Sequence, residues 1–329
     1  MRTFNWGIIG PGNIARDFVK DLELVEVPQR VSAVVGHNAE STEAFAEECN
    51  GCRSYTDFNS FLESETPDAV YIATPHPMHF EQTLSCLKKQ IPVLCEKPMT
   101  INAEQSAQLI EAAREKNTFL MEGMWIRFLP SIDNLLEIIR SGTIGRIISI
   151  SASMSYKAPK DPDSRYFDPA LGGGSLLDLG IYPVFLTHLL LGKPDRVEAS
   201  GTLSEKGIDK SCSMFFKYKS GQKAVLESSL LEQNEEPARI VGEKGTIRVL
   251  NPWFEKSKGL ELQLWGEEPV VYPLEWPGHG LQFEIQEVLN CLQDKKIESA
   301  KLSHGFSLDI IQSLDEIRNQ IHVTYDMYE

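Results

Sequence analysis

The sequence predicts an α/β protein, with an N-terminal doubly wound parallel sheet followed by an α+β domain with a large, mostly antiparallel, open-faced sheet. Three observations support this. Short apolar runs alternate with helical patterns up to about residue 125. A glycine-rich turn directly follows the first apolar run. Beyond about residue 130, strand-like runs follow one another through short turns, as in an antiparallel sheet.

The first part contains strand patterns that are brief and apolar nearly throughout, as in strands buried on both faces. They cover residues 6–10, 31–35, 69–74, 93–96 and 119–124. Helical patterns lie between them at residues 14–24, 41–49, 78–89 and 102–116. In the last pattern, Ala107, Ile110 and Ala113 recur at helical spacing. We therefore expect a first domain over residues 1–125.

The second part mixes a few helices with many strands. Helical patterns cover residues 132–139, 175–191, 281–293 and 304–320. Strand patterns cover residues 147–156, 196–203, 213–218, 224–231, 239–241, 246–250 and 260–265. Because 329 residues exceed the usual size of a single core, we expect residues 126–329 to form a second domain.

Charge and composition restrict the possible partners. The formal net charge is −15, which argues against binding to nucleic acid or to an anionic membrane, since both require a basic surface. We see no apolar run of membrane-spanning length and no signal peptide, so we expect a cytoplasmic protein. Cys49 and Cys52 form a C-x-x-C pattern without further ligands at metal-site spacing. We interpret them as ordinary thiols and expect no metal.

A dinucleotide-binding fingerprint opens the chain. Gly10, Gly12 and Ala15 match G-x-G-x-x-[GA] between the first strand and the first helix. The glycines allow the backbone to approach a pyrophosphate, which then meets the amides of Asn13 and Ile14 at the helix N-terminus. A structural glycine turn is the alternative. The context at the start of a strand–helix–strand unit favours a Rossmann-type nucleotide site.

The end of the second strand predicts the choice of cofactor. NAD-binding proteins usually carry an acidic residue there for the ribose 2′-hydroxyl. This sequence has Gly36, His37 and Asn38 instead. Gly36 is expected to leave room for a 2′-phosphate, to which His37 and Asn38 donate hydrogen bonds, although His37 as a plain surface residue is the alternative. We predict NADP, with NAD as the second possibility.

Glu96, Lys97 and Pro98 stand at the carboxyl end of a buried strand, where open parallel sheets bind their ligands. A desolvated charge there needs a partner or a use. Lys97 is therefore the first candidate catalytic residue, and a salt bridge to Glu96 or another acid is the alternative.

Asp178 and Tyr182 form the second candidate group. Gly172, Gly173 and Gly174 precede an otherwise apolar helix in which these two polar residues stand four positions apart, on one face. An acid and a phenol among leucines suggest the lining of a cleft. The alternative is a first-turn charge for Asp178 and a core position for Tyr182.

These motifs together resemble the glucose–fructose oxidoreductase/inositol dehydrogenase (Gfo/Idh/MocA) family. The resemblance covers nearly the whole chain and includes Thr74-Pro75-x-x-x-His79 and the glycine-rich segment up to Gly180. Many relatives carry His where Tyr182 stands. With tyrosine at this position, the chain resembles the branch of dimeric dihydrodiol dehydrogenase and the NADP-linked D-xylose dehydrogenases. Residues 121–128 and 167–169 are similar to the same branch.

The resemblance implies an NAD(P)-dependent dehydrogenase that acts on a CH–OH group of a sugar or cyclic diol. Lys97 and Tyr182 would be its acid–base dyad, with Asp178 nearby. The second domain would bind substrate and form a homodimer through its sheet. Beyond Lys97, the expected cofactor-binding residues are Gly10, Gly12, Asn13, Ile14, His37, Thr74, His76, His79, Glu96, Trp125 and Arg127. His76 and His79 are as readily explained as structural residues.

Two rival functions remain open from the sequence. A non-catalytic NAD(P)-binding sensor of the same fold would keep the cofactor site and lose the acid–base pair. The presence of both Lys97 and Tyr182 argues against it. An inositol-type dehydrogenase is disfavoured by the tyrosine at position 182. The sequence does not identify the substrate.

Overall fold

The structure is a computed structural model that describes residues 2–159, 161, 164–233, 235–326 and 328. The chain divides into two compact units. The first contains Met1–Trp125 with Pro277–Leu308, and the second contains Ile126–Trp276 with Asp309–Glu329. The first unit is continuous up to Trp125. Residues 277–308, however, belong to the first unit, not to one continuous domain over 126–329.

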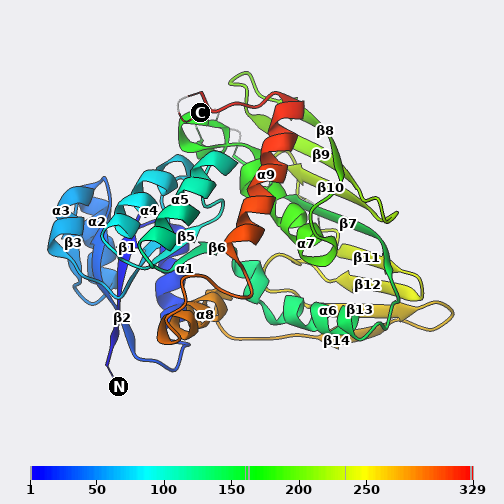
Figure 1. Cartoon of the computed structure of the whole chain (residues 1–329), viewed down its shortest axis with the longest axis horizontal. Coiled ribbons are helices and arrows are strands. Elements are labelled where there is room, and N and C mark those ends of the chain that lie inside the picture. Colours follow the sequence, from blue (N-terminus) through cyan, green and yellow to red (C-terminus); the bar gives the residue numbers. More distant parts are fainter. Residues whose placement is uncertain (1, 160, 162–163, 234, 327, 329) are drawn as a thin grey trace. The chain divides into compact units, whose positions relative to one another are not determined.

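The first unit is built on a parallel six-stranded sheet with the order β3-β2-β1-β4-β5-β6 (Figure 1). Neighbouring strands run parallel throughout. Chain direction thus carries the ends of β1, β4 and β5 to one edge. The strands are β1 (Phe4–Ile9), β2 (Gln29–Val35), β3 (Arg53–Tyr55), β4 (Ala69–Ile72), β5 (Val93–Glu96) and β6 (Leu120–Gly123).

Helices connect these strands and cover both faces of the sheet, which confirms the doubly wound fold. The pair α4 and α5 pack against each other, as do α1 and α8. The sequence pattern does not predict β3 or α3, both of which are short. The helices are α1 (Asn13–Leu22), α2 (Ala39–Glu48), α3 (Phe58–Ser64), η1 (His76–Met78), α4 (His79–Lys88), α5 (Ala103–Glu115) and α8 (Leu281–Gln293).

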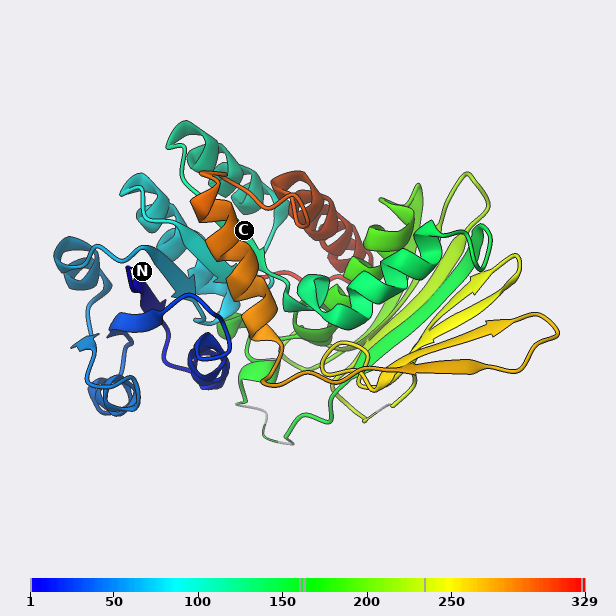
Figure 2. The same cartoon turned by 90° about the horizontal axis from the view of Figure 1, so that it is seen from below.

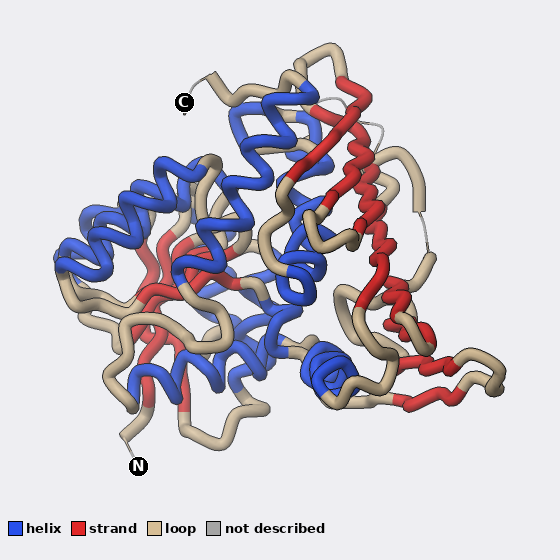
Figure 3. Tube along the Cα trace, turned by 45° about the vertical axis from the view of Figure 1, so that its right-hand side comes forward, coloured by secondary structure: helices blue, strands red, loops and turns tan. Residues whose placement is uncertain are grey.

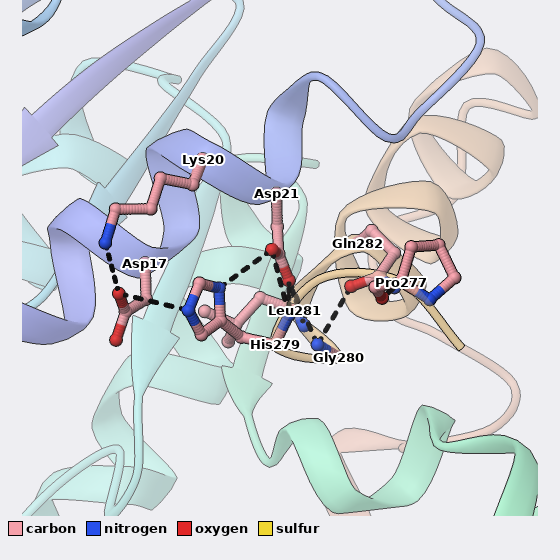
Figure 4. A network of polar contacts seen from close by, with 8 residues as sticks. All are labelled: Asp17, Lys20, Asp21, Pro277, His279, Gly280, Leu281 and Gln282. Carbon is pink, nitrogen blue, oxygen red and sulfur yellow. Dashed lines mark hydrogen bonds and ion pairs between the residues drawn. The ribbon is translucent and has the colours of Figure 1, made fainter. Parts of the chain in front are cut away.

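A buried carboxylate joins α8 to the first unit (Figure 4). Asp21, on α1, is 1% exposed and accepts hydrogen bonds from the backbone amides of His279, Gly280 and Leu281 at 2.9–3.0 Å. The His279 ring contacts the same carboxylate at 3.0 Å. The first amides of a helix have no partner within the helix, and a negative charge is favourable there. This link explains why residues 277–308 fold with the first unit.

The second unit contains an eight-stranded sheet with the order β14-β13-β12-β11-β7-β10-β9-β8. All neighbours are antiparallel except β7 and β10. This confirms the mostly antiparallel second sheet, and the sequence analysis missed only β14. The strands are β7 (Ile147–Ser155), β8 (Arg196–Leu203), β9 (Asp209–Lys217), β10 (Lys223–Ser229), β11 (Ala238–Gly242), β12 (Gly245–Val249), β13 (Gly259–Leu264) and β14 (Val270–Pro273).

Two helices of this unit pack on the sheet: α7 (Ile181–Leu191) contacts β7 and β10, and α6 (Pro130–Arg140) contacts β12 and β13. Figure 2 shows both on the same face, and Figure 3 separates helix from strand by colour. Further helical segments are η2 (Trp125–Phe128), η3 (Arg165–Phe167), η4 (Pro169–Leu171), η5 (Leu176–Gly180) and α9 (His304–Ile321).

The apolar segment Pro169–Leu191 has the length and hydropathy of a membrane span, but 83% of its most apolar window is buried inside the structure. It therefore matches a core helix of the second unit equally well. The sequence pattern predicts one helix over residues 175–191. The structure instead forms a π-helix, η5, that leads into α7.

Candidate active site

The glycine-rich turn forms at the carboxyl end of β1. Gly10 has φ +95°, and a Cβ there would lie 2.8 Å from the backbone of Ala73, so only glycine fits. Gly12 precedes α1, and no side chain caps this helix N-terminus in the part of the chain described. The first amides of α1, from Asn13 and Ile14 onward, therefore lie at an N-terminus suited to an anion. This arrangement fits a dinucleotide pyrophosphate.

The end of β2 differs from expectation in one respect. A Cβ on Gly36 would lie 2.5 Å from Thr42 Oγ1 and 2.7 Å from Pro11, so this position requires a glycine because of packing within the loop. The Asn38 side-chain oxygen accepts the Ser41 amide at 2.9 Å and caps α2. His37 is exposed.

Arg16 is a basic residue of this region that the sequence analysis did not single out. Its guanidinium donates to the Pro11 carbonyl at 3.2 Å and pairs with Glu48 at 2.8 Å. It also lies over the Phe45 ring, 5.4 Å from the centroid. Pro11 contacts the Gly36 position, so a cation stands where the glycine turn meets the end of β2. The sequence does carry an indication of Arg16, because this basic residue directly follows the dinucleotide-binding fingerprint.

His79 links the loops that follow β4 and β5. It is 0% exposed, and its two ring nitrogens lie 2.8 Å from the carbonyl oxygens of Thr74 and Pro98. Burial lowers the pKa of His79. His76 is also buried, with its ring centroid 5.9 Å from that of His79. The Thr74 hydroxyl donates to Gln82 at 2.6 Å. These residues shape the loop edge of the sheet.

Glu96 and Lys97 end β5 at that edge. The Glu96 carboxylate accepts hydrogen bonds from the Tyr71 hydroxyl and from the Lys97 backbone amide. Burial raises the pKa of Glu96, while the charge of Lys97 acts in the opposite direction. The loop continues to Met99, whose amide donates to Glu122 at 2.9 Å.

Two further buried acids, Glu122 and Glu284, interact with the Glu96–Lys97 end of β5, and no sequence pattern predicts them. Burial raises the pKa of Glu122, and the Lys97 charge opposes this shift. Glu284, on α8, is 0% exposed, and neither carboxyl oxygen has a hydrogen-bond partner among the described residues. Burial first, and then the charges of Glu96 and Asp21, raise its pKa well above the ordinary range. No local pattern marks Glu284, because it reaches this cluster from the distant segment that Asp21 anchors.

Trp125 and Arg127 both lie in the short helix η2, but the boundary between the units separates them. Trp125 is half-buried and ends the continuous part of the first unit. Arg127 is 6% exposed and pairs with Asp133 at 3.0 Å within the second unit.

Asp178 and Tyr182 lie in the second unit, close together along one helical segment. Asp178 is in the π-helix η5, and Tyr182 is the second residue of α7. They are 9% and 6% exposed. The Arg165 guanidinium lies 3.6 Å from the Asp178 carboxylate, and the Tyr182 ring centroid is 6.2 Å from that of Phe254. Single π-helical turns occur frequently at functional sites.

The fold and these residues define a class: a nucleotide-binding doubly wound domain joined to a sheet domain that carries a buried acid and phenol. Two family models match the chain. Residues 4–124 match the oxidoreductase family with an NAD-binding Rossmann fold, and residues 132–248 match the GFO/IDH/MocA C-terminal domain. The chain belongs to the Gfo/Idh/MocA family of oxidoreductases, as the motifs predicted.

Relatives match over nearly the full length. A trans-1,2-dihydrobenzene-1,2-diol dehydrogenase of Xenopus tropicalis is 33% identical over 97% of this chain and 98% of the relative. An NADP(+) D-xylose 1-dehydrogenase of Hypocrea jecorina is 31% identical over 98% of this chain and 93% of its own length. The aldose–aldose oxidoreductase structure from Caulobacter crescentus shares the fold, with TM-score 0.87, 22% identity and 98% coverage of both chains. The expected enzyme class, a nicotinamide-dependent dehydrogenase, is confirmed.

Proposed function

We propose that this oxidoreductase uses NADP and moves a hydride to or from the carbinol carbon of a sugar or cyclic diol. The observation that carries the proposal is Tyr182, together with Lys97, in a chain whose full-length relatives are named for a dihydrodiol and for D-xylose.

In the oxidative direction the substrate hydroxyl loses its proton to Tyr182, which acts as the general base. A free phenol has a pKa of about 10 and is a poor base at neutral pH. An ammonium about 4 Å from a phenolate stabilises it by roughly 4 kcal/mol at an effective dielectric of 20. Lys97 is proposed to supply that charge. Burial of the phenol opposes the effect.

Asp178 is proposed to accept a hydrogen bond from the substrate or to orient Lys97. Within its own unit the Arg165 guanidinium lies 3.6 Å from this carboxylate. An ionised Asp178 only accepts hydrogen bonds, which suits a substrate hydroxyl or an ammonium.

The cofactor is proposed to bind at the loop edge of the first unit. The glycine turn and the amides of Asn13 and Ile14 would hold the pyrophosphate, and Arg16 with His37 would hold the 2′-phosphate. Nearer the reacting end, the proposed contacts are Thr74, His76, Glu96, Lys97, Trp125 and Arg127, while the fully buried His79 supports their loops from within. When bound, the nicotinamide supplies the hydride acceptor or donor that the reaction needs.

We also propose a cytoplasmic homodimer that associates through the sheet of the second unit. The central strands β7 and β10 leave Ile148 and Val225 exposed at 42% and 48%. Apolar side chains on such a surface favour association. Sedimentation at micromolar concentration distinguishes a dimer from a monomer.

The activity test follows absorbance at 340 nm with a panel of aldoses and trans-dihydrodiols. Tyr182→Phe is expected to lower kcat by about 10²-fold or more while NADP affinity stays unchanged, because only proton transfer is lost. Lys97→Met should have a comparable effect. The double variant should be little worse than either single variant, because the two groups act as one unit. A wild-type protein that binds NADP tightly but is silent across the panel would be a sensor, not an enzyme.

The cofactor test compares kcat/KM for NADP and NAD. Arg16→Gln is expected to raise KM for NADP by about tenfold and to leave KM for NAD unchanged, because only NADP carries the 2′-phosphate. Lys20→Gln is the matched control, since Lys20 is one turn further along α1, 64% exposed and paired with Asp17. Equal or better wild-type turnover with NAD would refute the NADP preference.

A further inference from the structure

We propose that Asp209 is a positioning residue that fixes the start of the helical segment carrying Asp178 and Tyr182, and that the reaction requires its carboxylate although it touches no substrate. The inference rests on the proposed role of Tyr182. It assigns a function to a residue outside both sequence motifs.

The contacts place Asp209 at the first turn of that segment. Asp209 is the first residue of β9 and is 0% exposed. Its Oδ2 accepts a hydrogen bond from the Ser175 hydroxyl at 2.6 Å and from the Leu176 amide at 2.8 Å. Leu176 begins η5, two residues before Asp178. The carboxylate thus satisfies an amide that the helix itself leaves without a partner.

The preceding glycine loop is shaped around this carboxylate. Gly174 has φ +121°, and a Cβ there would lie 2.5 Å from Asp209 Oδ1. The Gly173 carbonyl accepts the Tyr325 hydroxyl at 2.6 Å. Ser228, on β10, contacts the Ser175 hydroxyl at 3.0 Å. The chain from residue 173 to residue 176 is therefore held on three sides. Loss of the Asp209 contacts would free the first turn of η5.

The carboxylate is incompletely satisfied for a buried charge. Oδ1 has no hydrogen-bond partner among the described residues. Burial raises the pKa of Asp209 to about 6, against the hydrogen bonds from Ser175 and Leu176. Cys212, on the same strand, is the titratable neighbour whose pKa the Asp209 charge raises further, and the Tyr325 hydroxyl faces the Gly174 position. A charge that costs stability in this way is expected where function requires it.

The titration of Asp209 predicts a pH dependence of kcat that a purely structural residue would not produce. Below about pH 6 the carboxyl takes up a proton. Protonation on Oδ1, which has no donor among the described residues, leaves Oδ2 as a neutral and therefore weaker acceptor for Ser175 and Leu176. The acid side of the pH profile of kcat should therefore include a limb near pH 6.

The test is Asp209→Asn, which keeps the size of the side chain and removes its charge. We expect kcat to fall by about tenfold or more, NADP affinity to stay unchanged and the limb near pH 6 to disappear. Asp195→Asn is the matched control, because Asp195 also accepts a backbone amide in this unit, from Lys219, but is exposed at the surface. It should leave both kcat and the pH profile unchanged.

Each outcome decides the inference. A folded Asp209→Asn variant with wild-type kcat and pH profile overturns it, and so does a variant that loses only cofactor affinity. If Asp209→Asn does not fold, Ser175→Ala removes one contact of the carboxylate, and unchanged kcat there overturns the inference.

A wild-type protein inactive on the whole panel would instead refute the proposed function. Hydrogen–deuterium exchange then tests the positioning directly. We expect faster exchange in Asp209→Asn over residues 172–185, and uniform exchange would contradict the inference.

Discussion

Two buried aspartates, one in each unit, anchor the start of a helix that lies far away in the sequence. Asp21 accepts three backbone amides and the His279 ring at the N-terminus of α8 (Figure 4). Asp209 accepts one amide and one hydroxyl at the start of η5, and one of its oxygens has no partner among the described residues. Both carboxylates accept hydrogen bonds at the start of a helix, but only some of the hydrogen-bonding capacity of the second carboxylate is used.

The difference separates a stabilising anchor from a functional one. A carboxylate with several amide donors gains enough hydrogen-bonding free energy to offset the cost of its desolvation. It therefore holds two segments together. A carboxylate with an unpaired oxygen costs stability, and in Asp209 this appears as a pKa raised to about 6. The partly satisfied anchor is the one on the segment with Asp178 and Tyr182.

The largest expected effect is on the satisfied anchor. Asp21→Ala should lower the free energy of unfolding of the protein by roughly 3–5 kcal/mol, because it leaves buried amides without a partner. Urea titration followed by circular dichroism measures it. Asp17→Asn is the control on the same helix. Asp17 is 34% exposed, pairs with Lys20 and contacts the His279 ring at 3.4 Å from the exposed edge of the same network, so its loss should cost under about 1 kcal/mol.

Asp209→Asn provides the contrasting measurement. A pKa near 6 in place of 3.8 means that the charge disfavours folding by roughly 3 kcal/mol. Removing that charge should therefore cost little stability or increase it. A loss as large as that of Asp21→Ala would contradict the distinction between the two anchors.

The sequence predicted the parts of the molecule that depend on local signals. The glycine turn at Gly10 and the parallel sheet follow from spacing and hydrophobic pattern within short windows. Lys97 and Tyr182 stood out because each is a polar residue in an otherwise apolar element. Their roles stay predictions.

The anchors could not be predicted, because their partners are distant in the chain. Asp21 and His279 are 258 residues apart, and Asp209 and Leu176 are 33 apart. Nothing near Asp209 indicates that it will meet a helix start. For the same reason the sequence analysis assigned residues 277–308 to the second domain. The π-helical turn at Asp178 was also missed, because its residues fit an α-helical pattern equally well.

A smaller effect comes from His188, near the other end of α7. His188 is 3% exposed and contacts the Ser313 hydroxyl at 3.0 Å. Burial lowers its pKa to about 4. Between about pH 6.5 and pH 4 the unfolded chain therefore binds a proton that the folded chain does not. The contribution of His188 to the free energy of unfolding is therefore complete above pH 6.5. It falls by up to about 3 kcal/mol as the pH drops.

Asp209 acts with the opposite sign in nearly the same range. Its raised pKa means that the folded state takes up a proton first, so its contribution favours folding as the pH falls below about 6. His188→Gln should remove the opposing slope. The variant is expected to lose less stability than wild type between pH 7 and pH 4.5, by about 2–3 kcal/mol.

Urea titrations of both proteins at several pH values measure this difference. His322→Gln is the control, because His322 is exposed in the same unit, and it should keep the wild-type slope. If His188→Gln also keeps that slope, burial of the imidazole does not set the pH dependence. If instead the slope becomes smaller in His188→Gln and is restored in part when Asp209→Asn is added, the buried imidazole in α7 and the buried carboxylate at the start of the segment contribute with opposite signs.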